Sequence, residues 1–225
     1  MIEIIDASDK LRETLDFAGH LPHYVPLNYL TNRTQVADIA DAVLVEIVAK
    51  FAPADEELAI DSAGLDTTSA SVHFQARSGS KRKKFVKLSL CVLIGSLLSA
   101  GLVLTWIPGN DKWKAMELMG RSAQAIMPKK QFADADYDAD WVQVFSREVW
   151  KAKTWIPPRD GTLGGEYLPL MTEAHLKQSG YIQRWRIESF TSGLKRTVSS
   201  ALSLRKPNAM MNEVDFNVLA YALRR

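Results

Sequence analysis

The chain has 225 residues, of which 47% are hydrophobic, enough for one packed domain or for one domain with a small appendage. Its single cysteine, Cys91, excludes an internal disulfide and agrees with a reducing cytoplasm. The four charged residues between positions 1 and 10 argue against a secretory signal peptide there.

The net charge of +2 hides an uneven distribution along the chain. Residues 1–61 carry 4 basic and 12 acidic side chains, so their balance is −8 and that of the remainder is +10. Basic residues concentrate within 77–84 and from Lys177 onward. Such asymmetry is typical of proteins that bind a polyanion, although a charge run can also be a solvated surface.

The N-terminal part reads as helical. Apolar residues at helical spacing predict a helix over 36–51, with Asn32 or Thr34 as its cap. An earlier helix is expected behind Ser8, and the proline-containing segment 21–26 is expected to separate the two helices.

Pro53 is expected to end the second helix, and we therefore divide the chain into a helical N-terminal segment, 1–54, and a larger domain, 55–225. Strands followed by alternating helices and strands predict an α/β domain, a mixed sheet flanked by helices. The expected elements are a short strand at 58–61, a weak extended stretch at 71–75, strands at 85–93 and 98–106, a helix at 112–126, a strand at 130–133, a helix at 139–150, a strand at 153–157 and helices thereafter.

The segment 88–107 runs for twenty residues without a charge. That length and composition suit a single membrane span, which would make the chain a small membrane protein. Two buried strands joined by a turn near Gly95 and Ser96 explain the same run, because strands buried on both faces are almost continuously apolar. The hairpin fits the flanking elements better, and we expect it.

A four-residue motif lies near the C-terminus. Tyr181, Arg184, Glu188 and Lys195 are separated by two, three and six residues, so they recur at steps that align them on one helix face. Read alone, the motif could be an exposed helix whose Arg–Glu pair contributes a few tenths of a kcal/mol.

Two upstream aspartates complete a possible catalytic set. Asp61 ends the apolar run 58–61, and Asp134 ends the run 132–134, so both are expected at strand ends. Two aspartates at strand ends and a glutamate on a late helix are the ligands that a divalent-metal phosphoryl-transfer site needs.

These motifs resemble those of the DDE transposases of bacterial insertion sequences, in the group with the Tyr-Arg-Glu-Lys pattern. The similarity covers roughly residues 55–225 and includes the surroundings of the first two acids, 59–64 and 133–138. The resemblance implies a ribonuclease-H-like catalytic core and DNA transposition, that is, metal-dependent strand cleavage and strand transfer at insertion-sequence ends.

The same resemblance implies the site residues. Asp61, Asp134 and Glu188 would be both catalytic and metal-binding, with two Mg²⁺ ions, or Mn²⁺ in their place, and with Asp61 shared between the ions. Tyr181, Arg184 and Lys195 would grip phosphates, together with the neighbouring Arg186 and Arg196. Two metal ions roughly 3.5–4 Å apart can activate water and stabilise the leaving oxygen.

The chain departs from the family pattern in two ways. Asp136 stands where the family usually has glycine, and Asp134, Asp136 and Asp138 share strand parity, so the resemblance alone favours Asp134. The N-terminal region is also short and acidic, which leaves open a truncated or inactive remnant that only binds DNA.

The implied partners are double-stranded DNA, as element ends and target, and a second copy of the chain bound to DNA, with no membrane. The implied location is the bacterial cytoplasm, in association with the nucleoid. No DNA-reading helix is visible in the first 55 residues, so we expect random and end-sequence DNA to bind within about tenfold of each other. The glycine-rich segment 161–165 lacks a phosphate-loop pattern and is expected to be a flexible link.

Overall fold

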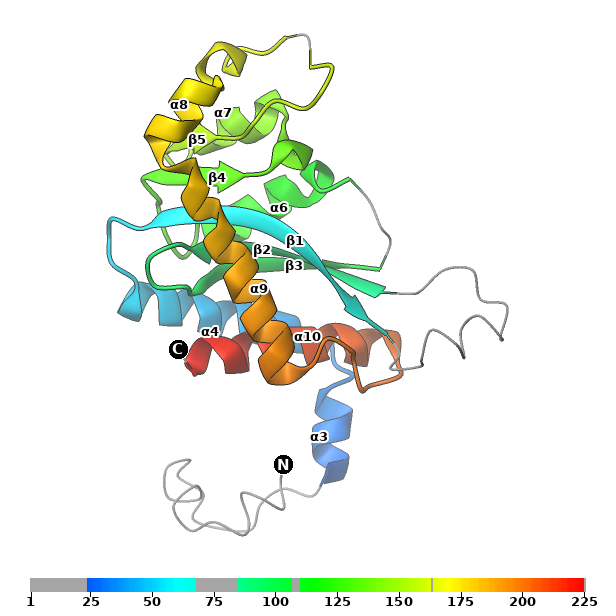
Figure 1. Ribbon diagram of the computed structural model, residues 1–225. Helices are drawn as coiled ribbons and strands as arrows, with labels where there is room; N and C mark the ends of the chain where they lie inside the picture. The colour runs from blue at the N-terminus through cyan, green and yellow to red at the C-terminus, as the bar shows by residue number, and fades with distance from the viewer. Residues whose placement is uncertain (1–23, 68–84, 107–109, 163, 225) are drawn as a thin grey trace.

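The computed structural model describes residues 24–67, 85–106, 110–162 and 164–224 and has an α/β fold (Figure 1). Within these residues a five-stranded mixed sheet has the order β3-β2-β1-β4-β5. Pairing is antiparallel between β1 and β2 and between β2 and β3, and parallel between β1 and β4 and between β4 and β5. This topology is consistent with a ribonuclease-H-like sheet, so the predicted fold class is confirmed. The strands are β1 (Glu57–Asp66), β2 (Phe85–Leu93), β3 (Ser99–Thr105), β4 (Lys130–Ala133) and β5 (Lys153–Trp155).

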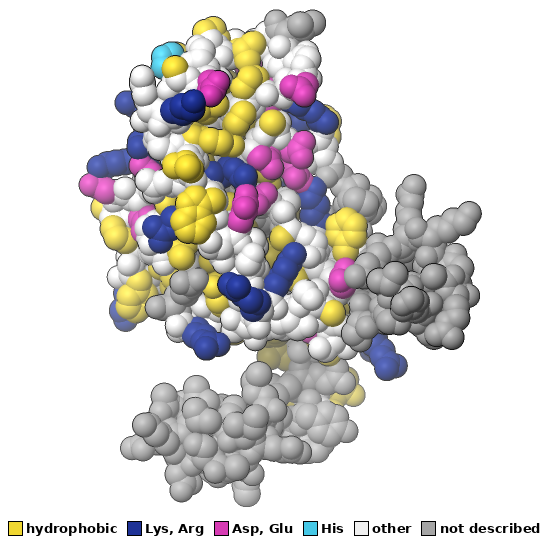
Figure 2. Space-filling view, viewed as in Figure 1, with side chains coloured by type: hydrophobic (Ala, Val, Ile, Leu, Met, Phe, Trp, Pro, Cys, Tyr) yellow, Lys and Arg dark blue, Asp and Glu magenta, His cyan; other side chains and the backbone are white. Residues whose placement is uncertain are grey.

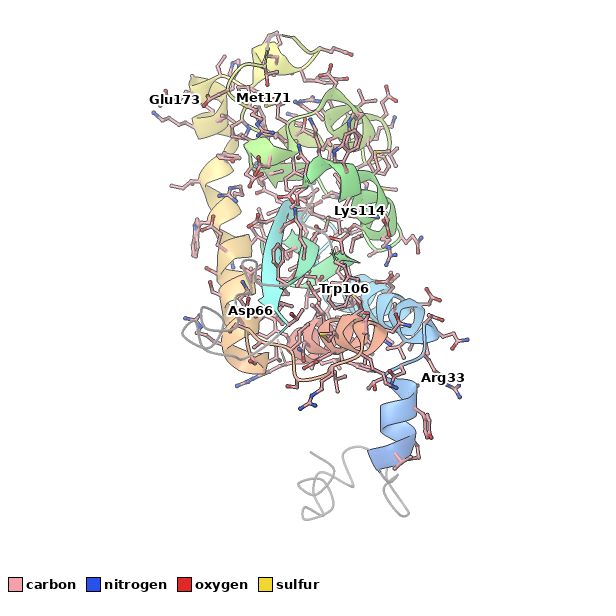
Figure 3. The ribbon with its side chains drawn as sticks, turned by 90° about the vertical axis from the view of Figure 1, so that its right-hand side faces the viewer. Arg33, Asp66, Trp106, Lys114, Met171 and Glu173 are labelled. Atoms are coloured by element: carbon pink, nitrogen blue, oxygen red, sulfur yellow. The ribbon has the colours of Figure 1, made fainter. Side chains whose placement is uncertain are left out.

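Helices cover both faces of the sheet. In Figure 1, α9 crosses one face diagonally, and the side view of Figure 3 has α6 and α7 on the opposite face. The helices are α3 (Tyr24–Leu30), α4 (Gln35–Phe51), α6 (Lys112–Ser122), α7 (Asp140–Glu148), α8 (Glu173–Ser179), α9 (Trp185–Val198) and α10 (Pro207–Leu223), with 3₁₀ turns η1 (Ala135–Tyr137), η2 (Leu168–Leu170) and η3 (Tyr181–Arg184).

The sheet has a hydrophobic core on each side because its central strands are buried on both faces. On the α9 side the core includes Leu65, Leu88 and Phe190. On the α6 side it includes Ile60 and residues from α6 and α7. The predicted strands are therefore nearly continuous apolar runs, and the polar residues that interrupt them stand out as candidates for function.

The uncharged run 88–107 supplies β2 and β3, which confirms the predicted hairpin. The backbone N–H groups of Gly95 and Ser96 donate to the two carboxylate oxygens of Glu56, at 2.8 and 2.7 Å, and this buried carboxylate fixes the turn. Among the described residues no helix combines the length and the apolar character that crossing a membrane requires. The hairpin therefore accounts for the apolar run without a spanning helix.

Helices α4 and α10 lie side by side along the β3 edge of the sheet (Figure 1). The side-chain amide of Asn212 on α10 donates to the carbonyl oxygens of Thr31 and Arg33, both at 2.8 Å, and so joins α10 to the segment that enters α4. Helix α4 contributes Leu44 to one core and Val48 to the other. Helix α4 is thus packed on the sheet.

Several predicted elements have different bounds. The strand expected to end at Asp61 continues to Asp66, because β2 pairs along its whole length as far as Asp66 with Phe85. The break expected at 21–26 is wrong from residue 24 onward, where α3 begins. Pro26 lies in the first turn of α3, where a missing N–H costs no helical hydrogen bond.

The predicted helix 36–51 is confirmed as α4, but Thr34 adopts a helical conformation and its side chain makes no capping hydrogen bond. The predicted helix 112–126 ends at Ser122, and the predicted strand 153–157 ends at Trp155. The expected cap Ser8, the weak strand at 71–75 and the basic residues 77–84 lie outside the described residues.

Candidate active site

Parallel pairing of β1 with β4 brings two of the predicted acids to neighbouring strands. The last paired residues are Ile60 and Ala133, so Asp61 and Asp134 are the next positions on the two strands. Asp134 follows the end of β4, as predicted, whereas Asp61 lies inside β1 rather than at its end. The pairing of β1 with β4 ends immediately before these two residues.

The backbone turns immediately after Asp134. Its Oδ1 accepts a hydrogen bond from the Asp136 N–H at 3.0 Å and so caps η1. The strand ends at Ala133 and a 3₁₀ turn follows. The expectation that Asp134, Asp136 and Asp138 share strand parity is therefore wrong. The side chain of Asp136 is exposed.

Asp138 has a separate structural role. Its Oδ2 accepts hydrogen bonds from the Arg159 N–H at 2.9 Å and from the Thr162 hydroxyl at 2.8 Å. The glycine-rich segment 161–165, which the sequence predicted to be a flexible link, is thus attached near its start, through Thr162, to the chain that carries Asp134. With Asp138 occupied and Asp136 exposed, Asp134 is the aspartate whose carboxylate lies beside Asp61.

The third predicted acid, Glu188, lies on α9. Tyr181, in the turn that precedes this helix, donates its hydroxyl to the Ala133 carbonyl oxygen at 3.0 Å, and its ring lies edge-on to Phe132 with centroids 6.2 Å apart. Ile187 and Phe190 on α9 are fully buried against the sheet. Tyr181 thus fixes the start of α9 beside the end of β4, and Glu188 lies next to the buried face of the helix.

Arg184 lies among the acids. Its Nη2 is 2.8 Å from Glu188 Oε1, and its Nη1 is 4.0 Å from Asp61 Oδ2. Its side chain is 21% exposed, whereas that of Glu188 is 56% exposed. The guanidinium group is thus the cation nearest to the carboxylates of Asp61 and Glu188 among the described residues.

The pKa values reflect the proximity of these acids. Burial is the largest effect that raises the pKa of Asp61, and the charges of Asp134 and Glu188 raise it further. The Ser62 N–H, which donates to Asp61 Oδ1 at 2.8 Å, and Arg184 lower it in part. Burial also raises the pKa of Asp134. Asp61 and Asp134, both half-buried, and the more exposed Glu188 form a set of carboxylates suited by its chemistry to a divalent cation.

The arrangement itself does not yet fit a metal ion. Across residues 24–67, 85–106, 110–162 and 164–224 no three His, Cys, Asp or Glu side chains are grouped so that they could hold one. Glu188 is instead paired with the guanidinium group of Arg184, at 2.8 Å. The three carboxylates are the kind of ligand that Mg²⁺ prefers, but in this structure Glu188 is turned to Arg184.

Three linked hydroxyl groups that the sequence analysis missed, those of the half-buried Ser62 and of the buried Ser89 and Tyr137, lie on the α6 side of the sheet. Ser62 Oγ is 2.9 Å from the Tyr137 hydroxyl and 2.9 Å from Ser89 Oγ. Tyr137 is fully buried between the sheet and α6. The signal in the sequence was the alternation of Ser62 and Ser89 with apolar residues inside strands, since a buried hydroxyl requires a partner.

The predicted DNA-binding residues follow α9 across the same face. Arg186 donates to the Gly95 carbonyl oxygen at 3.4 Å, and neither Lys195 nor Arg196 has an ion pair within the described residues. Lys177, Tyr181, Arg184 and Trp185 line a groove of about 610 Å³ beside the start of the helix. Figure 2 shows acidic side chains near the middle of this face with basic side chains beside them.

Comparison of the chain with protein-family models, with curated proteins and with solved structures finds no match.

Proposed function

We propose that the chain is a DDE transposase that cuts and joins DNA strands at the ends of an insertion sequence. The observation that carries the proposal is the position of Asp61 and Asp134 next to each other on parallel strands, with Glu188 on the helix that crosses them. The spacing of Tyr181, Arg184, Glu188 and Lys195, which resembles the family pattern, supports the same conclusion.

The proposed first reaction is hydrolysis of a phosphodiester bond. A water oxygen attacks phosphorus, the bond from phosphorus to the 3′ oxygen breaks, and the leaving oxygen takes up a proton. In the second reaction the freed 3′ hydroxyl attacks a target phosphodiester in the same way. Two Mg²⁺ ions, or Mn²⁺, held by Asp61, Asp134 and Glu188 would supply Lewis-acid activation in both reactions.

The residues of the chain bind and orient the DNA. Lys195 and Arg196 project from the last turn of α9 and have no competing ion pair in the described part of the chain, so they can contact phosphates. Arg184 offers a planar, bidentate group for the phosphate nearest the acids. A second copy of the chain on the same DNA is part of the proposal.

A second candidate function has an observation of its own. Since the acids surround a guanidinium group and form no three-residue metal group, the chain could be an inactive remnant that binds DNA through α9 and does not cut it. Both functions predict DNA binding that weakens with salt, but they differ in metal-dependent cleavage.

The test is nicking of a supercoiled plasmid that carries the genomic sequences flanking the coding region. With Mg²⁺, the wild-type chain is expected to convert the plasmid to open circles, and Asp61→Ala, Asp134→Ala and Glu188→Ala are expected to abolish this while DNA binding persists. DNA binding without nicking by the wild type would favour the inactive remnant. No binding at all would reject both functions.

A further inference from the structure

We propose that Arg184 couples the two ligands of the site: a DNA phosphate draws its guanidinium group away from Asp61 and Glu188, and the carboxylates then become free to bind a divalent cation. The inference rests on the proposed function, and it explains why the acids lie together without forming a metal group. Metal binding in the absence of DNA should accordingly be weak.

Arg184 and a divalent cation compete for the same carboxylate oxygens. Glu188 Oε1 is 2.8 Å from Arg184 Nη2, the distance of a charge-assisted hydrogen bond. Mg²⁺ requires carboxylate oxygens at about 2.0–2.1 Å in near-octahedral geometry. A carboxylate that is held by the guanidinium group is therefore turned away from the geometry that the ion requires.

Arg184 also changes the balance of charge at the site. Arg184 Nη1 lies 4.0 Å from Asp61 Oδ2, so the positive charge of the guanidinium group stands beside that carboxylate. Arg184 thus offsets part of the mutual repulsion that would otherwise favour a divalent cation.

A DNA phosphate is a better partner for the guanidinium group than the carboxylates are. A phosphodiester offers two oxygens that match the guanidinium fork, and Arg184 lines the groove beside the start of α9. Lys195 and Arg196 on the same helix would hold neighbouring phosphates. Glu188, 56% exposed, has free space in which to reorient once Arg184 leaves it.

The coupling has a thermodynamic consequence that can be measured. If DNA raises the metal affinity by some factor, the metal raises the DNA affinity by the same factor. A chain that cannot bring its carboxylates together until DNA is bound would also avoid loading metal at a site without substrate.

The experiment measures Mn²⁺ binding to the full chain by electron paramagnetic resonance of free Mn²⁺, with and without a short duplex DNA. The wild type is expected to bind Mn²⁺ about tenfold more tightly with the duplex than without it. Arg184→Gln is expected to bind Mn²⁺ about tenfold more tightly than the wild type without DNA, and to gain little from the duplex. Asp61→Asn identifies the signal that belongs to this site.

Arg205→Gln is the matched control, because Arg205 is exposed and this substitution removes the same charge outside the acidic cluster. The Arg205→Gln variant should bind Mn²⁺ as tightly as the wild type does. If Asp61-dependent Mn²⁺ binding occurs but is equally tight with and without DNA, or is unchanged in Arg184→Gln, the coupling is rejected and the proposed function stands. If no variant binds Mn²⁺ through Asp61 even with DNA, the proposed function is rejected as well.

Discussion

The hydroxyl oxygens of Ser62 and Tyr137 lie 2.9 Å apart, and this contact joins the strand that carries Asp61 to the turn that carries Asp134. Both hydroxyl groups lie behind the carboxylates, on the α6 side of the sheet. The separation of the two candidate metal ligands is therefore determined partly by a pair that touches neither DNA nor metal.

Tyr137→Phe should consequently reduce cleavage more than it reduces stability. Loss of one buried hydrogen bond costs about 1 kcal/mol of unfolding free energy, whereas a small shift between catalytic groups can lower the rate by about a hundredfold. Urea unfolding and plasmid nicking measure the two effects. Ser89→Ala is the matched control, because it removes a hydrogen bond to the same Ser62 and leaves the contact with Tyr137; cleavage at the wild-type rate in both variants would contradict the positioning role.

The choice between Asp134 and Asp136 can be tested directly. Asp134→Ala should lower plasmid nicking by about a thousandfold or more, as loss of a central catalytic group does. Asp136→Ala should retain most of the activity, because the side chain of Asp136 is exposed and its backbone N–H still donates to Asp134 Oδ1. The reverse pattern in matched nicking assays would mean that Asp136 is the ligand.

Lys195→Gln and Arg196→Gln should each weaken DNA binding by loss of one phosphate contact. The slope of log affinity against log salt concentration should fall by about 1 for each contact that is lost. Anisotropy of a labelled duplex across a salt series gives the slope. Lys129→Gln is the control, since Lys129 pairs with Asp55 before β4, at the opposite end of that strand from Asp134; a slope unchanged in the α9 variants would remove that helix from the DNA surface.

Asp215 on α10 should make the stability of the protein depend on pH. Burial, and to a smaller extent the charge of Asp41, raises its pKa to about 7, against the partial effect of Arg121. The folded state therefore keeps this proton to a higher pH than the unfolded state does. The free energy of unfolding should fall as pH rises from about 4 to about 7, by up to about 4 kcal/mol from this group.

Asp215→Asn removes this ionisation, and its stability advantage over the wild type should grow between pH 5 and pH 8. Urea unfolding at several pH values in the presence of a chelator measures it. Asp160→Asn, at an exposed position, should follow the wild-type curve. Parallel curves for the wild type and Asp215→Asn would show that Asp215 does not ionise across this range.

The sequence predicted the sheet well because burial on both faces leaves a clear signal. The strand 130–133 was predicted with its observed bounds, and the run 88–107 was resolved into a hairpin by the small residues at its turn. The extension of β1 beyond Asp61 was missed, because Ser62 and Gly64 interrupt the apolar pattern. Both residues are explained by tertiary contacts. The Ser62 hydroxyl hydrogen-bonds with that of Tyr137, and Gly64 faces the ring of Phe85.

The candidate site was less predictable than the fold. Spacing could align Arg184 with Glu188 on one helix, and the observed 2.8 Å pair agrees with that. Spacing could not reveal that the guanidinium group also approaches Asp61, because that depends on where α9 crosses the sheet. The expected strand parity of Asp134, Asp136 and Asp138 was wrong for a similar reason. The chain turns at Ala135, where the Asp134 side chain caps a 3₁₀ turn.

The bond from Asn212 to the segment before α4 has a consequence for how the chain matures. Helix α4 leaves the ribosome well before α10, which lies beside it, because Thr31 and Asn212 are 181 positions apart in the chain. Until then part of the apolar surface of α4 has no cover, and such surfaces promote aggregation in nascent chains. Production of the protein should therefore depend on chaperones that shield early segments until the late helix arrives.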